Sequence, residues 1–453
     1  SQLQRGLKNR HIQLIAMGGA IGTGLFLGSA HVIESAGPSI ILGYAIGGLI
    51  AFLIMRQLGE MIVEEPVAGS FSHFANKYWG KFAGFLAGWN YWILYVLVAM
   101  TELTAVAKYI NYWWPHIPAW ASVLTFFVII TLVNLGNVKF YGESEFWLSI
   151  VKVTAVVAMI VFGIYLLVTA GPDSTASFSN LWTHGGFFPH GLLPALVLVQ
   201  GVVFAFASIE LVGTAAGECK DPQTMVPKAI NSVIWRIGLF YVGSVVLLVM
   251  LLPWSAYQAG QSPFVTFFSK LGVPYIGSIM NIVVLTAALS SLNSGLYCTG
   301  RILRSMSMGG SAPKFMSKMS KQHVPYAGIL ATLVVYVFGV FLNYLVPSQV
   351  FEIVLNVAAL GIIASWAFIV VCQMRLRRAI KEGKTADVSF KLPGAPFTSW
   401  LTLVFLLSVL VLMAFDYPNG TYTIASLPLI AILLVAGWFG VRKRVAEIHR
   451  TAP

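Results

Sequence analysis

Glycine clusters around one threonine in an apolar stretch near the start of the sequence. Five glycines stand within thirteen residues, and two of them, Gly22 and Gly24, flank the β-branched Thr23. Each glycine in a helix interior costs about 1 kcal/mol relative to alanine, so this run favours unwound backbone at residues 22–24. The other three glycines fit close helix packing equally well. Unwound backbone exposes amide N–H groups that suit a carboxylate and carbonyls that suit a cation such as an ammonium group.

Ionisable side chains also occur inside apolar stretches, where a charge is costly. Lys152 lies over a turn into one such stretch, and Glu102 lies deep in another. Glu210 closes a second, weaker interruption that begins at Phe204. A charged group near the centre of a bilayer costs several kcal/mol and indicates a functional site by default. Two simpler interpretations stay open: the lysine could extend its ammonium group to the lipid–water interface, and each glutamate could be a protonated, hydrogen-bonded packing residue.

The composition excludes a soluble protein. Of the 453 residues, 58% are hydrophobic and only 10% are charged, whereas soluble domains carry about 25% charged residues. A membrane helix needs about 20 mostly apolar residues. Twelve stretches qualify, approximately 13–33, 38–62, 82–107, 119–137, 146–169, 192–216, 229–252, 274–299, 325–345, 350–372, 398–415 and 422–441. We therefore predict an all-α polytopic membrane protein with twelve transmembrane helices.

The basic residues indicate how these helices are oriented, because cytoplasmic loops of membrane proteins are enriched in Lys and Arg. With the N-terminus in the cytoplasm, all but three of the 28 Lys and Arg residues fall in cytoplasmic loops or span ends. The exceptions are Lys108 and Lys270 on the opposite side and Lys152 inside the fifth span. This split predicts that both termini are cytoplasmic. It also accounts for the net charge of +12, so nucleic acid is not needed as a partner.

The two interruptions fall in the first and the sixth predicted spans, which are five spans apart. An odd offset means that these spans cross the membrane in opposite senses, as expected for an inverted repeat. Paired interruptions in two such repeats are typical of the mid-membrane binding site of a transporter. The sequence thus predicts a first five-helix repeat over 1–170 and a second over 171–372. A cytoplasmic loop and two peripheral helices would occupy 373–453.

Four ordered blocks resemble bacterial amino-acid permeases of the amino acid–polyamine–organocation superfamily, within its amino acid transporter family. The blocks are Gly-Gly-Ala-Ile-Gly-Thr-Gly-Leu-Phe at 18–26, Arg-Gln-Leu-Gly-Glu at 56–60, Lys-Asp-Pro at 220–222 with Val-Pro-Lys-Ala-Ile-Asn at 226–231, and Asn-Ser-Gly at 293–295. The resemblance covers essentially the whole chain. It implies the LeuT-like fold, with broken helices 1 and 6 in a five-plus-five inverted repeat, and secondary active import across the bacterial cytoplasmic membrane.

The resemblance to subgroups of the family differs along the chain. Residues 1 to about 170 resemble aromatic amino-acid permeases, with Gly-Trp-Asn-Tyr-Trp at 88–92 and Glu-Leu-Thr-Ala-Val at 102–106. The C-terminal two-thirds resemble L-asparagine permeases, with Val-Phe-Ala-Phe-Ala-Ser-Ile-Glu at 203–210 and Ala-Leu-Ser-Ser-Leu-Asn at 288–293. Spans 6, 8 and 10, which line the site in this fold, favour asparagine as the substrate. An aromatic amino acid, favoured by span 3, is the alternative.

The resemblance also assigns roles to individual residues. The substrate-binding residues that it implies lie in spans 1, 3, 6 and 8: Ala20, Gly22, Thr23, Gly24, Glu102, Phe204, Ala207, Ser208, Ser291 and Asn293. In this assignment the amides of Thr23 and Gly24 meet the substrate carboxylate. The carbonyls of Ala20, Phe204 and Ala207 meet its ammonium group. The Phe204 side chain would also close over the substrate as a gate.

The resemblance also implies that three ionisable residues within the predicted spans take part in proton coupling. In the family, a lysine matching Lys152 occupies the place where sodium-coupled relatives bind a cation, and its protonated ammonium group could replace the metal. Glu102 aligns with a family glutamate near the substrate, which favours proton handling or contact with the substrate amine. Glu210 belongs to the sixth-span signature and would stabilise unwound backbone or take part in coupling.

These features together predict a proton-coupled symporter that imports a neutral L-amino acid. Its partners would be the substrate, the proton and the lipid bilayer, with no obligate protein partner, no cofactor and no metal. The eight histidines are scattered near loops and form no ligand cluster. A channel would need a continuous polar pore, and a membrane-embedded enzyme would need a nucleophile–base or metal-ligand spacing. Neither pattern occurs in the sequence, so both classes are disfavoured.

Overall fold

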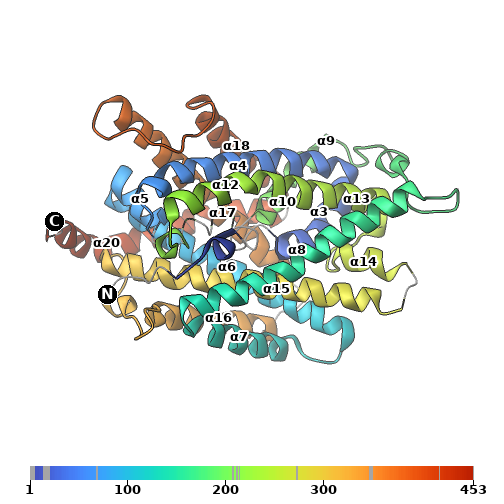
Figure 1. The fold of residues 1–453 in the computed structure, drawn as a ribbon, viewed down its shortest axis with the longest axis horizontal. Helices are drawn as coiled ribbons and strands as arrows, with labels where there is room; N and C mark the ends of the chain where they lie inside the picture. The colour runs from blue at the N-terminus through green and yellow to red at the C-terminus, as the bar shows by residue number, and fades with distance from the viewer. Residues whose placement is uncertain are drawn as a thin grey trace.

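The computed structural model describes residues 6–13, 21–67, 70–206, 209–210, 213, 215–271, 274–345, 350–417 and 419–451. Long helices run side by side along one axis, and both ends of the chain lie toward the left-hand end of the bundle in Figure 1. We call this end the terminal end; the N-terminal residues 6–13, helix α5 and the end of α20 lie there. A hydrogen bond of 2.7 Å between Asn76 and His449 joins α5 to α20 at this end.

The regular structure of the described residues is helical, apart from one isolated β-bridge. The longer α-helices are α4 (Ile40–Glu64), α6 (Lys81–Trp113), α7 (Ala119–Leu135), α8 (Val138–Val168), α12 (Pro222–Ile237), α15 (Ile276–Met308), α16 (Tyr326–Leu345), α17 (Val350–Lys381), α18 (Phe397–Ala414) and α20 (Leu427–Thr451). The shorter ones are α2 (Thr23–Phe26), α3 (Gly28–Ala36), α5 (Ser70–Tyr78), α9 (Leu192–Val197), α10 (Val199–Ala205), α13 (Ser244–Leu251), α14 (Pro263–Ser269) and α19 (Asn419–Ala425). A π-helical segment, η4 (Gly238–Gly243), joins α12 to α13.

The longer helices overlap the predicted spans. Within the described residues, seven helical segments are long and apolar enough to cross a membrane, and four further apolar helices are shorter. The prediction of an all-α polytopic membrane protein is therefore confirmed. That all twelve segments cross the bilayer, and in which directions, stays a prediction.

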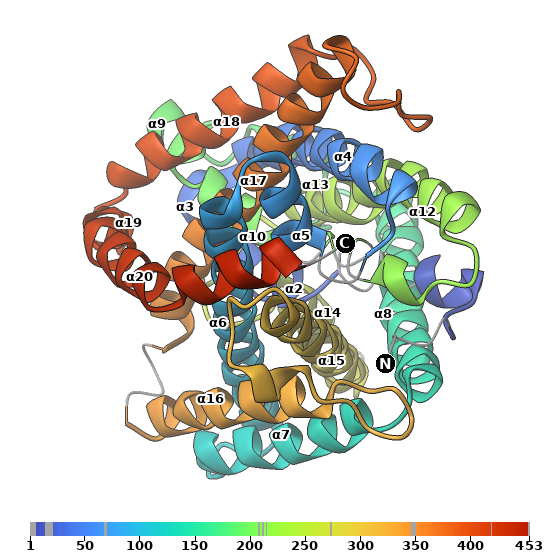
Figure 2. The ribbon, with the colours of Figure 1, turned by 90° about the vertical axis from the view of Figure 1, so that its left-hand side faces the viewer.

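Burial separates inner helices from outer ones. Within Lys81–Trp113, 78% of the 18-residue apolar stretch is buried by the rest of the protein. Within Asn419–Thr451, none of the corresponding stretch is buried. Helix α6 packs against α15 and α17 in the interior of the bundle, and α18, α19 and α20 lie along its outside (Figure 2). The outer surfaces remain apolar, as lipid-facing surfaces must be.

The fifth predicted span begins earlier than expected. Helix α8 starts at Val138 rather than near residue 146, because the Asn137 side chain caps it by accepting a hydrogen bond of 2.8 Å from the Phe140 amide. Asparagine is among the favoured residues at this position. The prediction of a start near 146 is therefore wrong, and the longer helix contains two additional glutamates, Glu143 and Glu145.

The two predicted interruptions are present in part in the described backbone. Gly22 is extended, with φ −149° and ψ −161°, but α2 begins at Thr23. The prediction of unwound backbone over 22–24 is therefore wrong for Thr23 and Gly24, which form the first turn of α2. In the sixth segment α10 ends at Ala205, and Ile209 and Glu210 lie in a turn. Helices α2 and α10 contact each other near the middle of the bundle (Figure 2). The fold therefore brings the two interruptions together.

Candidate functional site

The first interruption is hydrogen-bonded to the third predicted span. The Thr23 hydroxyl donates to the carboxylate of Glu102 on α6, and both side chains are buried. The Thr23 amide also faces this carboxylate. A Cβ added to Gly22 would collide with the Ser291 hydroxyl of α15 and would lie 3.7 Å from Glu102 Oε1. Four of the predicted site residues from three spans thus lie together.

The second interruption packs directly on the first. A Cβ added to Gly24 would come within 2.7 Å of Ala205 Cα and 3.1 Å of the Phe204 carbonyl oxygen, distances that backbone atoms cannot accommodate. Only glycine permits this approach. The Ala205 carbonyl accepts a hydrogen bond of 2.7 Å from the Tyr241 hydroxyl, so the end of α10 has a polar partner in η4. The Phe204 side chain is itself buried.

Lys152 is fully buried on α8 rather than extended to an interface. Its Nζ donates a hydrogen bond of 2.6 Å to the Ile21 carbonyl, immediately before the extended Gly22. The interpretation that this ammonium group reaches the lipid–water interface is wrong. The lysine is within electrostatic reach of Glu102 and of Glu145. One cationic side chain therefore holds the unwound backbone of the first span.

Glu210 follows the second interruption and contacts two inner helices. Its carboxylate accepts a hydrogen bond of 3.3 Å from the Tyr95 hydroxyl of α6 and one of 3.5 Å from the Trp366 indole of α17. These bonds connect the segment after the break to both helices. Both predicted roles of Glu210, stabilising unwound backbone and proton coupling, stay predictions.

Glu145 is a polar residue near the site that was missed by reasoning from the sequence. Its carboxylate accepts hydrogen bonds from Ser290 at 2.5 Å, from Ser149 at 3.1 Å and from Asn293 at 3.2 Å. It was overlooked because a glutamate just before an apolar run looks like part of a loop. A signal was available in the sequence: residues 145, 149 and 152 are all polar and lie on one helix face.

Of the remaining predicted site residues, some are described by the structure and others are not. Asn293 donates to Glu145 and accepts a hydrogen bond of 2.7 Å from Asn134, so both ends of its amide have partners on the side of α15 facing α7 and α8. Its predicted contact with substrate would require these bonds to rearrange. Ala20, Ala207 and Ser208 lie outside the described residues.

Comparison with known proteins agrees with this geometry. The family model described as amino acid permease matches residues 11–450. The chain belongs to the amino acid permease family. The protein is accordingly a transporter and not an enzyme, and with its long apolar helices it is a multi-pass protein of the bacterial inner membrane. The predicted family resemblance is confirmed.

Individual relatives distinguish the two subgroups. The permease is 71% identical over 453 residues to the L-asparagine permeases of Salmonella typhimurium strain LT2 and Escherichia coli strain K12. These alignments cover 99% of this chain and 91% of each relative. It is 52% identical over 447 residues to the aromatic amino acid transport protein of Escherichia coli strain K12, with 99% and 97% covered. Over the whole chain, the asparagine permeases are the more similar group.

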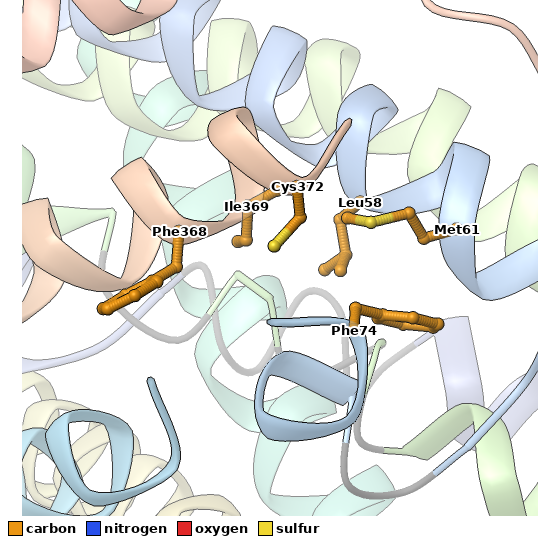
Figure 3. A pocket seen from close by; sticks show the side chains of 6 residues that line it. All are labelled: Leu58, Met61, Phe74, Phe368, Ile369 and Cys372. Carbon is orange, nitrogen blue, oxygen red and sulfur yellow. The ribbon is translucent and has the colours of Figure 1, made fainter. Parts of the chain in front are cut away.

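A small apolar cavity lies away from this site. It is lined by residues of α4, α5 and α17: Leu58, Met61, Phe74, Phe368, Ile369 and Cys372 (Figure 3). The side chains around it are hydrocarbon, thioether or thiol, and they offer no partner for the charged ends of an amino acid. The cavity is therefore not a candidate for the permease's substrate site.

At the terminal end, a buried ion pair closes the bundle around the end of the sixth segment. Arg301 of α15 donates to Glu218 at 2.7 Å from Nε, and the Tyr297 hydroxyl donates to the same carboxylate at 2.6 Å. The Arg301 guanidinium also lies 3.9 Å from the centroid of the Tyr297 ring. The N-terminal segment adds an isolated parallel bridge, with the Leu7 amide donating to the Glu218 carbonyl at 3.0 Å.

The described part of the permease contains no group of three or more His, Cys, Asp and Glu side chains that could hold a metal ion. The three cysteines, Cys219, Cys298 and Cys372, are buried free thiols. Backbone amides, carbonyls, hydroxyls and the buried ionisable groups are thus the chemistry that the described site offers.

Proposed function

We propose that this permease imports L-asparagine together with protons across the cytoplasmic membrane. The observation that carries the proposal is the 71% identity, over 99% of the chain, to proteins described as L-asparagine permeases. The buried hydrogen bond between Lys152 and the Ile21 carbonyl supports the proton as coupling ion. A lysine ammonium at the unwound backbone supplies the positive charge that a metal ion would otherwise provide.

The proposed topology has twelve crossings with both termini in the cytoplasm. Residues 1–170 and 171–372 form the two inverted repeats, and 373–453 form the cytoplasmic loop and two peripheral helices. The excess of Lys and Arg in the loops on the terminal side supports this orientation. The contact between Gly24 and Ala205, one residue from each interruption, is what an inverted repeat with a central site requires.

In the proposed binding mode, the amino acid lies between the two interruptions. The amides of Thr23 and Gly24 have no carbonyl one turn earlier in α2, so they can donate to the substrate carboxylate. Carbonyls of Ala20, Phe204 and Ala207 accept from the ammonium group. The Phe204 ring closes over the substrate. Hydroxyls of Ser208 and Ser291 serve the carboxamide, which needs both donors and acceptors when buried.

Glu102 gives this binding mode a means of coupling to protons. Its carboxylate now accepts from the Thr23 hydroxyl and faces the Thr23 amide. A substrate carboxylate at the same amides would bring two like charges together, which is unfavourable in a buried site. Protonation of Glu102 removes that repulsion. Substrate binding and proton uptake therefore favour each other at this position.

An aromatic substrate is the second candidate, supported by the 52% identity to aromatic amino acid transport proteins. Its pocket would have to come from Tyr91, Tyr95 and Met100 of α6. The Tyr91 and Tyr95 rings pack together with centroids 4.7 Å apart, and the Tyr95 hydroxyl is bonded to Glu210. This packing favours the smaller, polar substrate.

Uptake by purified protein in proteoliposomes tests the proposal. Labelled asparagine should accumulate under an inward proton gradient and should still accumulate when sodium is replaced completely by choline. Excess unlabelled asparagine should compete strongly and phenylalanine weakly. Strict dependence on sodium would refute proton coupling. Stronger competition by phenylalanine, tyrosine and tryptophan would instead support the aromatic candidate and leave transport intact.

A further inference from the structure

Helix α8 carries three buried polar side chains on one face. Glu145, Ser149 and Lys152 follow one another at i, i+4 and i+7, a spacing that aligns side chains along a helix. None of the three is exposed, although the exposed apolar residues of this helix, such as Val161 and Val168, face outward. A buried row of an acid, a hydroxyl and an amine is costly unless each group has a partner.

The partners of Glu145 hold its carboxylate in one place. Ser149 Oγ donates at 3.1 Å and Ser290 Oγ at 2.5 Å to Oε1, while Asn293 Nδ2 donates at 3.2 Å to Oε2. Asn134 of α7 in turn donates at 2.7 Å to Asn293 Oδ1. Three helices thus orient this one carboxyl group. Ser149 lies between Glu145 and Lys152 along the helix.

Two buried carboxyl groups lie near the single ammonium group of Lys152. Both Glu145 and Glu102 of α6 are within electrostatic reach of its ammonium group. Among the described residues, Tyr141 of α8 is a further ionisable group beside Glu145; Arg301 of α15, further along, is already paired with Glu218. One ammonium group neutralises one buried carboxylate, so a neutral cluster holds one additional proton on a carboxyl group. The cluster can therefore store the coupling proton in more than one position.

Glu145 lies on the terminal side of Lys152. Two residues before it, Glu143 pairs with Arg10 and with His11 of the N-terminal segment. At Gly142, an added Cβ would lie 3.0 Å from Leu7 Cδ2 and 3.3 Å from His11 Cγ. A proton that moved from Lys152 to Glu145 would therefore move toward the end of the bundle that we assign to the cytoplasm.

We propose that Glu145 is the residue through which the coupling proton leaves Lys152 for the cytoplasmic side, with the Ser149 hydroxyl as the bridge. The Nζ–H bond of the lysine breaks and its electron pair stays on nitrogen, while the hydroxyl oxygen accepts this proton and passes its own to the Glu145 carboxylate. The products are a neutral amine and a carboxylic acid, which then releases the proton. The neutral amine donates a weaker hydrogen bond to Ile21, which frees the unwound backbone to rearrange. This proposal rests on the proposed proton symport.

Exchange and accumulation separate this role from a purely structural one. Counterflow exchange of labelled for unlabelled asparagine needs the loaded carrier to reorient but needs no net proton release. We expect Glu145→Gln to keep exchange within about twofold of wild type and to lose proton-driven accumulation by at least about tenfold. The dependence of its uptake on internal pH should also disappear. Glu145→Asp, which keeps the carboxyl group, should recover part of the accumulation.

A matched pair of hydroxyl variants tests the bridge. Ser149→Ala removes the buried hydroxyl, and Thr154→Ala removes an exposed one from the same helix. Only Ser149→Ala should slow proton-driven accumulation, with exchange retained. Should Glu145→Gln fail to fold, this pair carries the test, and equal accumulation by the two variants would overturn the proposal.

Other outcomes are equally decisive. Wild-type accumulation by Glu145→Gln overturns the relay and leaves the proposed symport intact. Equal loss of exchange and accumulation, without recovery in Glu145→Asp, is the pattern of a structural residue and also overturns it. A wild-type protein that exchanges asparagine but ignores the proton gradient would refute the proposed coupling itself, and the relay with it.

Discussion

The Thr23 hydroxyl donates a hydrogen bond to the Glu102 carboxylate, joining the short helix after the first interruption to the most buried long helix of the bundle. The two residues are 79 positions apart in the sequence. Because the Thr23 amide faces the same carboxylate, Glu102 lies where the proposed binding mode places the substrate carboxylate. In that binding mode, the substrate must displace this side chain or find it protonated.

Removing the hydroxyl of Thr23 should strengthen substrate binding, because it weakens the bond that the substrate has to displace. Thr23→Val is nearly isosteric but leaves the buried Glu102 carboxyl group of the substrate-free protein without this donor, and an unsatisfied buried polar group costs about 1–3 kcal/mol. We expect the Kd for asparagine, measured with labelled substrate on purified protein, to fall by about tenfold. Thr23→Ser keeps the hydroxyl and is the control. Wild-type affinity in Thr23→Val would show that the bond is not part of the site.

Gly24 and Gly28 form a matched pair for testing the contact between the two interruptions. A Cβ at Gly24 would come within 2.7 Å of Ala205 Cα, whereas at Gly28 the nearest atoms are 3.8 Å away, an ordinary contact. Gly24→Ala should therefore abolish uptake while the protein still inserts, and Gly28→Ala should leave uptake unchanged. Measuring uptake together with the amount of folded protein in the membrane distinguishes loss of function from loss of expression. Equal uptake by both variants would contradict the packing argument.

The sequence was informative wherever the cause is local. Glycines around Thr23 disfavour a helix whatever surrounds them, and apolar length alone identifies membrane segments. Lys152 was correctly expected inside its span, since its neighbours in sequence are apolar, although its partner Ile21, 131 residues away, could not be inferred. Family resemblance rather than physics supplied the roles of the residues at both interruptions.

Hydrogen bonds and ion pairs between residues far apart in the sequence could not be predicted from local pattern and hydropathy. The predicted start of the fifth span excluded Glu145, because hydropathy penalises a glutamate that is in fact satisfied by Ser290 and Asn293 from a helix 145 or more positions away. Arg301 was assigned to a cytoplasmic span end, and it is buried at 2% exposure by its pairing with Glu218. An ionisable residue at the end of an apolar stretch cannot be recognised as buried without its partner, and a single sequence does not contain that pairing.

Replacing Lys152 by methionine should uncouple or stop transport. The change keeps the volume of the side chain but removes the donor to Ile21, so the carbonyl before the interruption loses its partner. We expect proton-driven accumulation of asparagine in proteoliposomes to fall by at least about tenfold. Lys139→Met removes an exposed lysine from the first turn of the same helix and should accumulate asparagine normally. Accumulation by Lys152→Met that still followed the proton gradient would exclude this lysine from coupling.

The ion pair between Arg301 and Glu218 should matter more for stability than the exposed pair between Lys391 and Asp387. Both members of the first pair are buried, with side-chain exposures of 2% and 0%, whereas those of the second are 53% and 56% exposed. Removing one partner of a buried pair leaves an uncompensated charge and costs about 3–5 kcal/mol, so Glu218→Gln should lower the thermal stability of the detergent-solubilised protein markedly. Lys391→Met should change it little, because solvent screens exposed pairs.

A double variant tests whether an uncompensated buried charge causes the loss of thermal stability in the single variants. Arg301→Met combined with Glu218→Leu removes both charges and fills the space with apolar groups, which is often close to neutral for a buried pair. It should therefore unfold at a higher temperature than either Arg301→Met or Glu218→Leu alone. If the double variant is instead less stable than both single variants, an uncompensated charge is not what destabilises them. Loss of packing at the positions of Arg301 and Glu218 would then be the cause, and the pair would not be a buried charge held only by its partner.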